Sequence, residues 1–166
     1  MDYICHYASP LGVVTLASDG RALTGLWFDG QKHFGDTLSP LREEKPLPVF
    51  EQAQAWLDLY FQGKEPDFTP ELAPAGTPFR QAVWALLLTI PYGQTMTYGA
   101  LAARLGRASP RAVGGAVARN PISLIIPCHR VVGAGGSLTG YAGGVEKKRA
   151  LLRLEGAGLS RLHLPK

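Results

Sequence analysis

The sequence predicts an α+β protein of two domains, a β-rich domain over residues 1–74 and a largely helical domain over residues 75–166. Three observations support this prediction: short β-type runs near the start of the chain, apolar residues at helical spacing after residue 48, and a proline-rich stretch at residues 63–76. With 46% hydrophobic residues, the 166-residue chain can bury a core in one domain or in two small ones.

The first half begins with three short runs of β-branched, aromatic and apolar residues. Turn sequences at residues 9–12 and 18–20 separate these runs, so we expect an antiparallel meander. The three strands are predicted at residues 3–8, 12–17 and 22–28. Residues 31–48 are polar and contain proline, which indicates a loop, and apolar spacing near 3.6 predicts an amphipathic helix at residues 49–62.

The second half carries several helix signals. Thr77 is a candidate N-cap, Pro78 suits the first helical position, and Pro91 ends the helix that they begin. Further helices are predicted at residues 98–105, capped by Thr97, at residues 111–119, and at residues 145–154. The last helix is expected to carry its charged residues on its polar side, namely Glu146, Lys147, Lys148, Arg149 and Arg153.

The predicted helices at residues 98–105 and 111–119 flank a turn that contains Gly106. Two short helices around such a turn match a helix-turn-helix, although any packing corner between two helices has the same pattern. The second helix has a poor helix propensity because it contains Gly114 and Gly115. Such a smooth helix suits a close approach to another surface, either a DNA groove or a packed helix.

The two halves of the chain carry opposite charge. Residues 1–74 hold 5 Lys and Arg against 11 Asp and Glu, a net charge of −6, whereas residues 75–166 hold 12 against 2, a net charge of +10. A basic half indicates a polyanionic partner, and nucleic acid is the usual one. The alternative is an accident of composition that also lets the two halves attract each other.

Composition also bears on where the protein works. No apolar stretch approaches the roughly 18 residues that a membrane span needs, and the first residues lack the pattern of a secretory signal. The two cysteines, Cys5 and Cys128, form no disulfide framework, and a thiol that must stay reduced suits the cytoplasm. We therefore expect a cytoplasmic protein that does not contact a membrane.

The segment at residues 126–130 places a thiol, an imidazole and a guanidinium next to one another, directly after an apolar run. A thiol becomes a good nucleophile when it loses its proton, and neighbouring positive charge lowers its pKa. Cys128 is therefore a candidate nucleophile. A buried structural cysteine is the alternative, because free cysteine is among the most buried residue types.

A nucleophilic thiol needs a proton acceptor and a group that orients the acceptor. His129 is adjacent to Cys128, but consecutive side chains of an extended segment point to opposite faces. If both act, either the backbone turns here or a water bridges them. Glu155 is one of two carboxylates in the basic half and lies among apolar residues, which suggests an imidazole orienter, with a solvated helix end as the alternative.

Several motifs resemble those of the O6-alkylguanine-DNA alkyltransferase family. They are, in chain order, Arg111-Ala112-Val113-Gly114-Gly115-Ala116, Asn120-Pro121, Pro127-Cys128-His129-Arg130-Val131-Val132, Gly140-Tyr141-Ala142-Gly143-Gly144 and Leu151-Leu152-Arg153-Leu154-Glu155-Gly156. The resemblance covers residues 77–157 with family-like spacing, and the β-meander is also similar. It implies a ribonuclease H-like N-terminal domain and a winged-helix-like C-terminal domain with the helix-turn-helix.

The resemblance implies a DNA repair protein that moves an alkyl group from guanine O6 irreversibly onto its own Cys128. By motif position, His129 would be the base that acts through a water, and Glu155 would hold the His129 ring. Asn120 would brace the turn that carries the thiol. Tyr98 would donate a proton to guanine N3 as the base leaves.

The resemblance also implies that the damaged base is flipped out of the duplex, and that Arg111 fills the gap. Extrusion of a base costs free energy, which an inserted side chain and basic contacts offset. The expected DNA-binding residues are Arg111, Ala112, Gly114, Gly115 and Tyr98. The expected pocket for the flipped base contains Val117, Ser123, Tyr141 and Ala142.

Two positions depart from the family pattern. Ala142 stands where other members carry a hydroxyl residue, and Ser123 replaces a proline found in some members, so both bear on which alkyl group fits. Some members bind zinc in the N-terminal domain, but this half offers only Cys5, His6 and His33, and the first two are neighbours on a predicted strand. We therefore expect no metal and no cofactor.

The expected partner is double-stranded DNA that contains O6-alkylguanine, with O4-alkylthymine left open as a further substrate. We expect a monomer, and cooperative binding along DNA is also left open. Other classes fit less well. A non-catalytic lesion-binding relative would not retain Cys128. A helix-turn-helix regulator would not need Cys128 together with His129, Tyr98 and Glu155. A cysteine hydrolase would need a hydrolysable thioester intermediate, whereas this chain would form a stable thioether.

Overall fold

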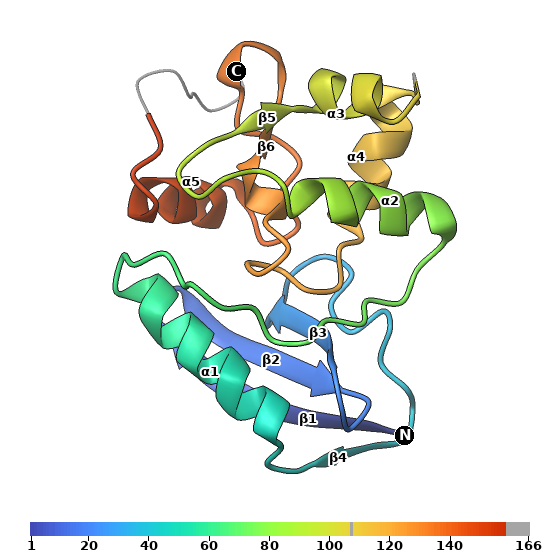
Figure 1. The fold of residues 1–166 in the computed structure, drawn as a ribbon, viewed down its shortest axis with the longest axis vertical. Coiled ribbons are helices and arrows are strands. Elements are labelled where there is room, and N and C mark those ends of the chain that lie inside the picture. The colour runs from blue at the N-terminus through green and yellow to red at the C-terminus, as the bar shows by residue number, and fades with distance from the viewer. Residues whose placement is uncertain (107, 159–166) are drawn as a thin grey trace. The chain divides into compact units, whose positions relative to one another are not determined.

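In this computed structural model, which describes residues 1–106 and 108–158, the chain divides into two compact units (Figure 1). The first unit is Met1–Ala75 together with Pro121–Ile125, and the second is Gly76–Asn120 together with Ile126–Lys166. The chain thus returns to the first unit for a few residues after it has entered the second. The domain boundary between residues 74 and 75 stays a prediction.

The first unit is built on a four-stranded sheet with the strand order β3-β2-β1-β4. The predicted antiparallel meander is confirmed by three strands, which are β1 (Asp2–Ser9), β2 (Gly12–Ser18) and β3 (Leu23–Phe28). A fourth strand, β4 (Arg42–Glu44), pairs parallel with β1, so the sheet is mixed rather than purely antiparallel and residues 31–48 are not all loop. All three β4 residues are exposed and polar, and therefore neither alternation nor β-propensity marks them in the sequence.

One helix, α1 (Pro48–Phe61), packs on this sheet, where the apolar spacing predicts it. Its buried face is formed by Val49, Phe50, Ala53, Trp56, Leu57 and Tyr60. At the β3 edge, the Leu26 amide donates to the Pro121 carbonyl and the Ser123 amide donates to the Leu26 carbonyl. These two bonds explain why residues 121–125 belong to the first unit.

Within its described residues, up to residue 158, the second unit contains four α-helices. They are α2 (Pro78–Leu87), α3 (Tyr98–Arg104), α4 (Pro110–Ala118) and α5 (Val145–Leu154). The predicted caps are confirmed, because the side chains of Thr77 and Thr97 accept hydrogen bonds from the Arg80 and Ala100 amides. Helix α4 begins one residue earlier than predicted, with Ser109 as its N-cap.

Helices α3 and α4 form the predicted helix-turn-helix pair, and α2 packs against α4. The Trp84 indole nitrogen donates to the Ala116 carbonyl at 2.9 Å, and both groups are buried. This bond fixes one face of α4 inside the unit, while Arg111, Ala112 and Gly115 of the same helix are exposed.

A short parallel ladder joins β5 (Met96–Thr97) to β6 (Val131–Val132). Two single-turn 3-10 helices, η1 (Cys128–Arg130) and η2 (Ala134–Gly136), lie on either side of β6 in the chain. Two-residue strands are too short to show alternation, so this ladder was not predicted. Because β5 leads directly into α3, the ladder places Tyr98 close to the segment that carries Cys128.

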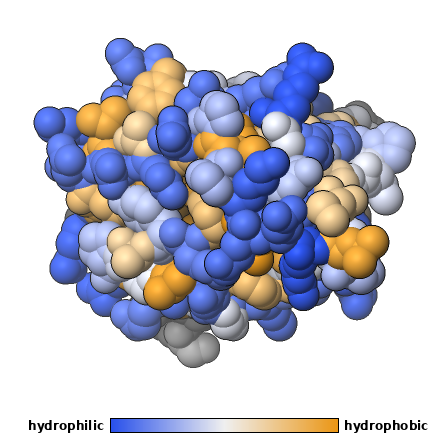
Figure 2. Space-filling view, turned by 90° about the horizontal axis from the view of Figure 1, so that it is seen from below, coloured by the Kyte–Doolittle hydropathy of each residue, from blue (hydrophilic) through white to orange (hydrophobic). Residues whose placement is uncertain are grey.

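None of the helices in residues 1–106 and 108–158 combines the length and the apolar content that a membrane crossing requires. On the face shown in Figure 2, hydrophobic side chains occur in small groups among hydrophilic ones.

Candidate active site

Cys128 opens the single 3-10 turn η1 and is 5% exposed. The turn is closed by backbone bonds from the Cys128 amide to the Ile126 carbonyl at 2.8 Å and from the Arg130 amide to the Pro127 carbonyl at 3.0 Å. The backbone therefore turns at Cys128 and His129, which is one of the two arrangements left open for this pair. The alternation of an extended strand no longer separates the two side chains.

Asn120, just beyond the end of α4, contacts this turn. Its side-chain amide donates to the Ile126 carbonyl at 2.8 Å, and a hydrogen bond from the same side chain lowers the pKa of Cys128. Both groups are buried, so water does not compete for these bonds. Asn120 thus holds the chain on one side of Pro127 and the thiol on the other.

His129 and Glu155 form a buried pair. The distance from Nε2 to Oε2 is 2.5 Å, and neither side chain is exposed, which excludes the solvated helix end considered for Glu155. Burial alone would raise the pKa of Glu155, but hydrogen bonds and charge from His129 and Arg130 lower it to about 2. An ionised carboxylate only accepts hydrogen bonds, so His129 Nε2 carries the proton and Nδ1 is the basic nitrogen. Burial lowers the pKa of His129, which keeps the ring neutral at pH 7.

Arg130 and Gly93 hold the same carboxylate. Arg130 Nε donates to Oε1 at 2.8 Å and Nη2 to Oε2 at 3.2 Å, while the Gly93 amide donates to Oε1 at 3.0 Å. Gly93 has φ +79°, and a Cβ there would lie 3.0 Å from the Glu155 carbonyl oxygen, so only glycine fits. Because Arg130 Nη1 also donates to the Ile90 carbonyl at 2.7 Å, the guanidinium ties Glu155 to the end of α2.

Several groups act on the Cys128 thiol in opposite directions. Burial raises its pKa, whereas the Asn120 hydrogen bond, the charge of Lys148 and nearby backbone amides lower it. Burial outweighs these groups and the pKa of Cys128 is raised, so the expectation that adjacent positive charge favours the thiolate is not met, and the charge that opposes burial is that of Lys148. The neighbours His129 and Arg130 face Glu155 instead.

The sequence predicts Lys148 on the polar side of its helix, and this prediction is wrong. It is fully buried, and its Nζ donates to the Thr139 carbonyl at 2.7 Å. Burial lowers the pKa of Lys148 to about 8. A signal for this position was present, because Lys148 lies three residues from both Val145 and Leu151 and so shares the apolar stripe of α5.

Tyr98 opens α3 and lies between two glycines. A Cβ at Gly140 would come within 2.7 Å of the Tyr98 hydroxyl oxygen, and a Cβ at Gly114 would lie 3.9 Å from its ring. The hydroxyl donates to the Thr139 carbonyl at 3.3 Å. Burial and the charge of Cys128 raise the pKa of Tyr98 to about 12.

Tyr141 also lies near the thiol, since the charge of Cys128 adds to burial in raising its pKa. The ring is 9% exposed, and its hydroxyl has no hydrogen-bond partner within the described part of the chain. Of the other predicted pocket residues, Val117 is buried on α4 and Ala142 is half-buried. Ser123 is buried in the first unit.

Four of the five predicted DNA-binding residues lie on α4, and the fifth, Tyr98, opens α3. Arg111, Ala112 and Gly115 are exposed, whereas Gly114 is half-buried against Tyr98. A Cβ added at Gly115 would meet no atom within 4 Å. Gly114 therefore packs against Tyr98 inside the protein, whereas Gly115 lies on an open part of the α4 surface.

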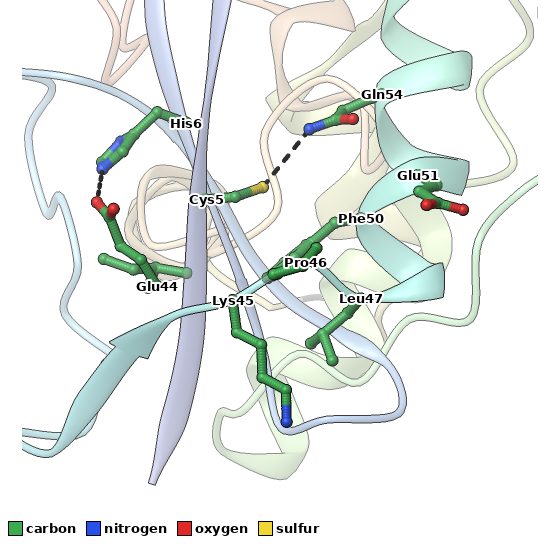
Figure 3. A pocket seen from close by; sticks show the side chains of 10 residues that line it. Cys5, His6, Glu44, Lys45, Pro46, Leu47, Phe50, Glu51 and Gln54 are labelled. Carbon is green, nitrogen blue, oxygen red and sulfur yellow. Dashed lines mark hydrogen bonds and ion pairs between the residues drawn. The ribbon is translucent and has the colours of Figure 1, made fainter.

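The candidate zinc ligands of the first half do not converge. Cys5 and His6 point to opposite sides of β1, with Cys5 directed to Gln54 and His6 to Glu44 (Figure 3). His33 pairs with a different carboxylate. Within the described residues, no group of three or more metal-binding side chains occurs.

The same region of the first unit holds a cavity of about 530 Å³. Its lining includes Cys5, Lys45, Phe50 and Gln54 (Figure 3). Cys128, His129 and Glu155 are not among the lining residues. Burial raises the pKa of Cys5 to about 11, so this thiol is a poor nucleophile at neutral pH.

Comparison with known proteins places both halves of the chain in one family. A family model described as the 6-O-methylguanine DNA methyltransferase DNA binding domain matches residues 78–157, and one described as the ribonuclease-like domain of the same protein matches residues 3–74. The chain belongs to the 6-O-methylguanine DNA methyltransferase family. The resemblance noted in the sequence and the α+β fold class are thereby confirmed.

Individual proteins similar to this chain carry names that match this family. Proteins named methylated-DNA–protein-cysteine methyltransferase are 48% identical in Mycobacterium tuberculosis, over 90% of this chain and 92% of the relative, and 44% identical in Methanosarcina acetivorans, over 93% and 99%. The solved Mycobacterium tuberculosis OGT in complex with DNA has 44% identity and a TM-score of 0.84 over 96% of this chain and 94% of that one. This 6-O-methylguanine DNA methyltransferase family member is thus an enzyme of direct DNA repair, which moves an alkyl group from DNA to a protein cysteine.

Proposed function

We propose that Cys128 accepts the alkyl group from O6-alkylguanine in double-stranded DNA, in a single irreversible transfer. The observation that carries this proposal is the turn η1, which brings the buried thiol next to the buried His129–Glu155 pair. Cys5 is the other cysteine of the chain, and its neighbour His6 points to the opposite side of β1, where it pairs with Glu44 (Figure 3).

The proposed reaction begins with the thiol proton. The neutral His129 ring takes it through a bridging water at Nδ1, while Glu155 keeps the ring in this tautomer. The Cys128 thiolate then attacks the alkyl carbon, a C–S bond forms, and the bond between that carbon and guanine O6 breaks. The electron pair passes into the purine, and Tyr98 donates a proton to guanine N3, so that guanine leaves as a neutral base.

Each protein molecule reacts only once, because the alkylated Cys128 is a stable product. The thioether on Cys128 is not hydrolysed by water, so the thiol is not regenerated and each molecule repairs one lesion. Asn120 supports the reaction by holding the turn at the Ile126 carbonyl. A buried and braced thiol also excludes bulk water from the reacting atoms.

We propose that residues 75–166 bind the DNA and accept the alkyl group, and that residues 1–74 are a structural domain. The net charge of +10 on the second half supports binding to the phosphate backbone, and the Mycobacterium tuberculosis OGT–DNA complex supports DNA as the partner. The contacts are assigned to Arg111, Ala112, Gly114, Gly115 and Tyr98, with Arg111 in the gap of the flipped base. The protein is proposed to act as a monomer in the cytoplasm.

The flipped base is proposed to lie against Val117, Ser123, Tyr141 and Ala142. The buried Tyr141 hydroxyl supports this assignment, because an unsatisfied buried donor is stabilised when a ligand accepts its hydrogen bond. Ala142 offers only its backbone amide, so one side-chain hydrogen bond of hydroxyl-bearing relatives is absent.

Intact-mass spectrometry tests the proposal. After incubation with duplex DNA that contains O6-methylguanine, the protein should gain the mass of one methyl group, and peptide mapping should place it on Cys128. Cys128→Ser should show no gain, whereas Cys5→Ser should react like the wild type. A methyl group on Cys5, or no gain at all, would contradict the proposal. DNA with O4-methylthymine, used in parallel, decides whether that lesion is also a substrate.

A further inference from the structure

The buried Lys148 has no place in the mechanism proposed above. Full burial of an ammonium group is costly unless the group is bonded, and few proteins retain it without a reason. Its Nζ donates a hydrogen bond of 2.7 Å to the carbonyl oxygen of Thr139, in the loop between η2 and α5. Lys148 therefore anchors this loop from inside the second unit.

The Thr139 carbonyl oxygen accepts a second hydrogen bond, from the Tyr98 hydroxyl. The ammonium bond of 2.7 Å is short and charge-assisted, whereas the hydroxyl bond of 3.3 Å is longer than the usual O–H···O range. Two donors thus compete for one oxygen, and Lys148 makes the stronger bond. The Tyr98 hydroxyl is held in place but only weakly bonded.

Tyr98 has little freedom to move away from this oxygen. Its ring lies against Gly114 of α4, and its hydroxyl lies so close to Gly140 that a Cβ there would come within 2.7 Å. The orientation of the hydroxyl therefore depends on where the backbone at residues 139–140 lies. Lys148 is the side chain that fixes this backbone.

We propose that Lys148 is a positioning residue for Tyr98, which it holds ready to give up its proton by taking the stronger hydrogen bond at the Thr139 carbonyl oxygen. The inference rests on the proposed function, in which Tyr98 protonates guanine N3. When the C–O6 bond breaks, the hydroxyl must exchange its bond to Thr139 for a bond to the base. That exchange costs less when the bond being lost is already weak.

The same geometry favours the product of the proton transfer. Tyr98 becomes a phenolate until a proton returns from solvent or from the proton that Cys128 released, so atoms and charges balance over the whole reaction. A phenolate next to the Thr139 carbonyl would be repelled by it. The Lys148 ammonium, bonded to the same oxygen, offsets that repulsion.

Lys148 also faces ionisable groups on η1, and these define the competing role. Its charge lowers the pKa of both Cys128 and His129, so it could act on the thiol alone. The two roles differ in what they require. A role on the thiol affects every reaction of Cys128, whereas a role on Tyr98 affects only transfer from a base that needs protonation.

The test compares two reactions of Cys128 in the same protein. Single-turnover transfer from O6-methylguanine DNA is measured beside alkylation by iodoacetamide, whose iodide leaves without a proton, each over a range of pH. Lys148→Gln and Lys148→Met remove the charge, Tyr98→Phe removes the proton donor, and Lys148→Gln with Tyr98→Phe completes a double-mutant cycle. Lys147→Gln, on the next position of α5, is the matched control.

We expect Lys148→Gln to slow transfer by about tenfold more than it slows iodoacetamide alkylation, as a fraction of the roughly 10²–10⁴-fold that a positioned proton donor provides. In the Tyr98→Phe background this extra loss should vanish. Equal losses in both reactions, or an unchanged extra loss in Tyr98→Phe, would overturn the proposal. Partial unfolding would expose the buried Cys128 thiol to iodoacetamide while it slows transfer, so the two rates are compared under conditions in which urea unfolding curves show each variant to be fully folded. A wild-type protein that transfers no methyl group would refute the proposed function and this inference together.

Discussion

The chain contains the dipeptide Cys-His twice, and in both places the histidine pairs with a glutamate. His6 Nε2 lies 3.0 Å from Glu44 Oε1 on the first unit, and both side chains are largely exposed. His129 Nε2 lies 2.5 Å from Glu155 Oε2 on the second unit, and neither is exposed. The same residues therefore form a solvated ion pair in one region and a candidate catalytic cluster in the other.

The backbone makes the first difference between the two regions. On β1 the side chains of Cys5 and His6 alternate, so the thiol and the imidazole face opposite sides of the sheet (Figure 3). On η1 the chain turns within three residues, and Cys128 and His129 enter one buried cluster. A short motif thus has chemical meaning only when the local backbone is known.

The surroundings of the thiol make the second difference. Burial raises the pKa of both thiols, and at Cys5 a hydrogen bond from Gln54 lowers it while the negative charge of Glu44 raises it further. At Cys128, Asn120 and Lys148 act in the opposite direction. Burial alone therefore does not decide reactivity, and the polar groups that are buried with the thiol do.

The largest expected contrast comes from the two glutamates. Glu155→Gln leaves Arg130 buried without its counter-charge, so the free energy of unfolding should fall by about 3–5 kcal/mol. Methyl transfer should also slow by at least about 100-fold, because His129 loses its orienting partner. Glu44→Gln breaks an exposed pair and should change the free energy of unfolding by less than about 0.5 kcal/mol. Urea unfolding and single-turnover transfer measure both. Equal effects of the two substitutions would contradict the comparison.

A second contrast comes from the amides that bond the two thiols. Asn120→Ala removes a buried donor from the Ile126 carbonyl and should lower the free energy of unfolding by about 1–3 kcal/mol, with slower transfer. Gln54→Ala removes a long contact of 3.8 Å to the Cys5 sulfur and should leave transfer unchanged. Loss of transfer in Gln54→Ala would show that the two regions are coupled.

Acid titration tests the charge of Glu155 in the folded protein. The pKa of Glu155 is lowered from 4.5 to about 2 in the folded protein. The unfolded state therefore binds more protons in this range, so Glu155 contributes stability that is present above about pH 4.5 and is lost as the pH falls through about 2. In urea titrations at successive pH values, the difference between wild type and Glu155→Gln should shrink toward low pH. A constant difference would mean that the carboxylate is not ionised in the folded state.

The smallest expected effect is an alkaline one at Cys5. Its pKa is raised from 9.0 to about 11, so the folded state holds its proton longer than the unfolded state. Cys5 therefore contributes stability that is present below about pH 9 and is lost as the pH rises through about 11. Relative to Cys5→Ala, the wild type should become less stable over this interval. Parallel curves for the two proteins would count against a perturbed Cys5.

Much of the fold could be predicted because its elements follow simple periodicities and caps. The meander, α1 and the caps at Thr77 and Thr97 depend on local residues, and the structure confirms them. Strand β4 and the β5–β6 ladder were missed, since each is held by pairing with a segment distant in sequence rather than by its own composition. Short strands of this kind depend on tertiary contacts.

The candidate site shows the same division. Cys128, His129 and Glu155 could be named from the sequence because their residue types carry the chemistry and the family motifs contain them. Lys148 could not, because lysine on a helix is usually solvated, and only its place on the apolar stripe of α5 indicates burial. The role of Thr139 also could not be predicted from the sequence, because Thr139 acts through its backbone carbonyl and every residue type has one.

The position of Glu155 at the end of α5 has a consequence for the order of synthesis. A chain is made from its N-terminus, so the ribosome completes Cys128 before it adds the carboxylate that orients His129. The thiol is therefore present for a time without an assembled base beside it. For a residue that reacts only once, this order delays full assembly of the site until α5 has been synthesised and folded.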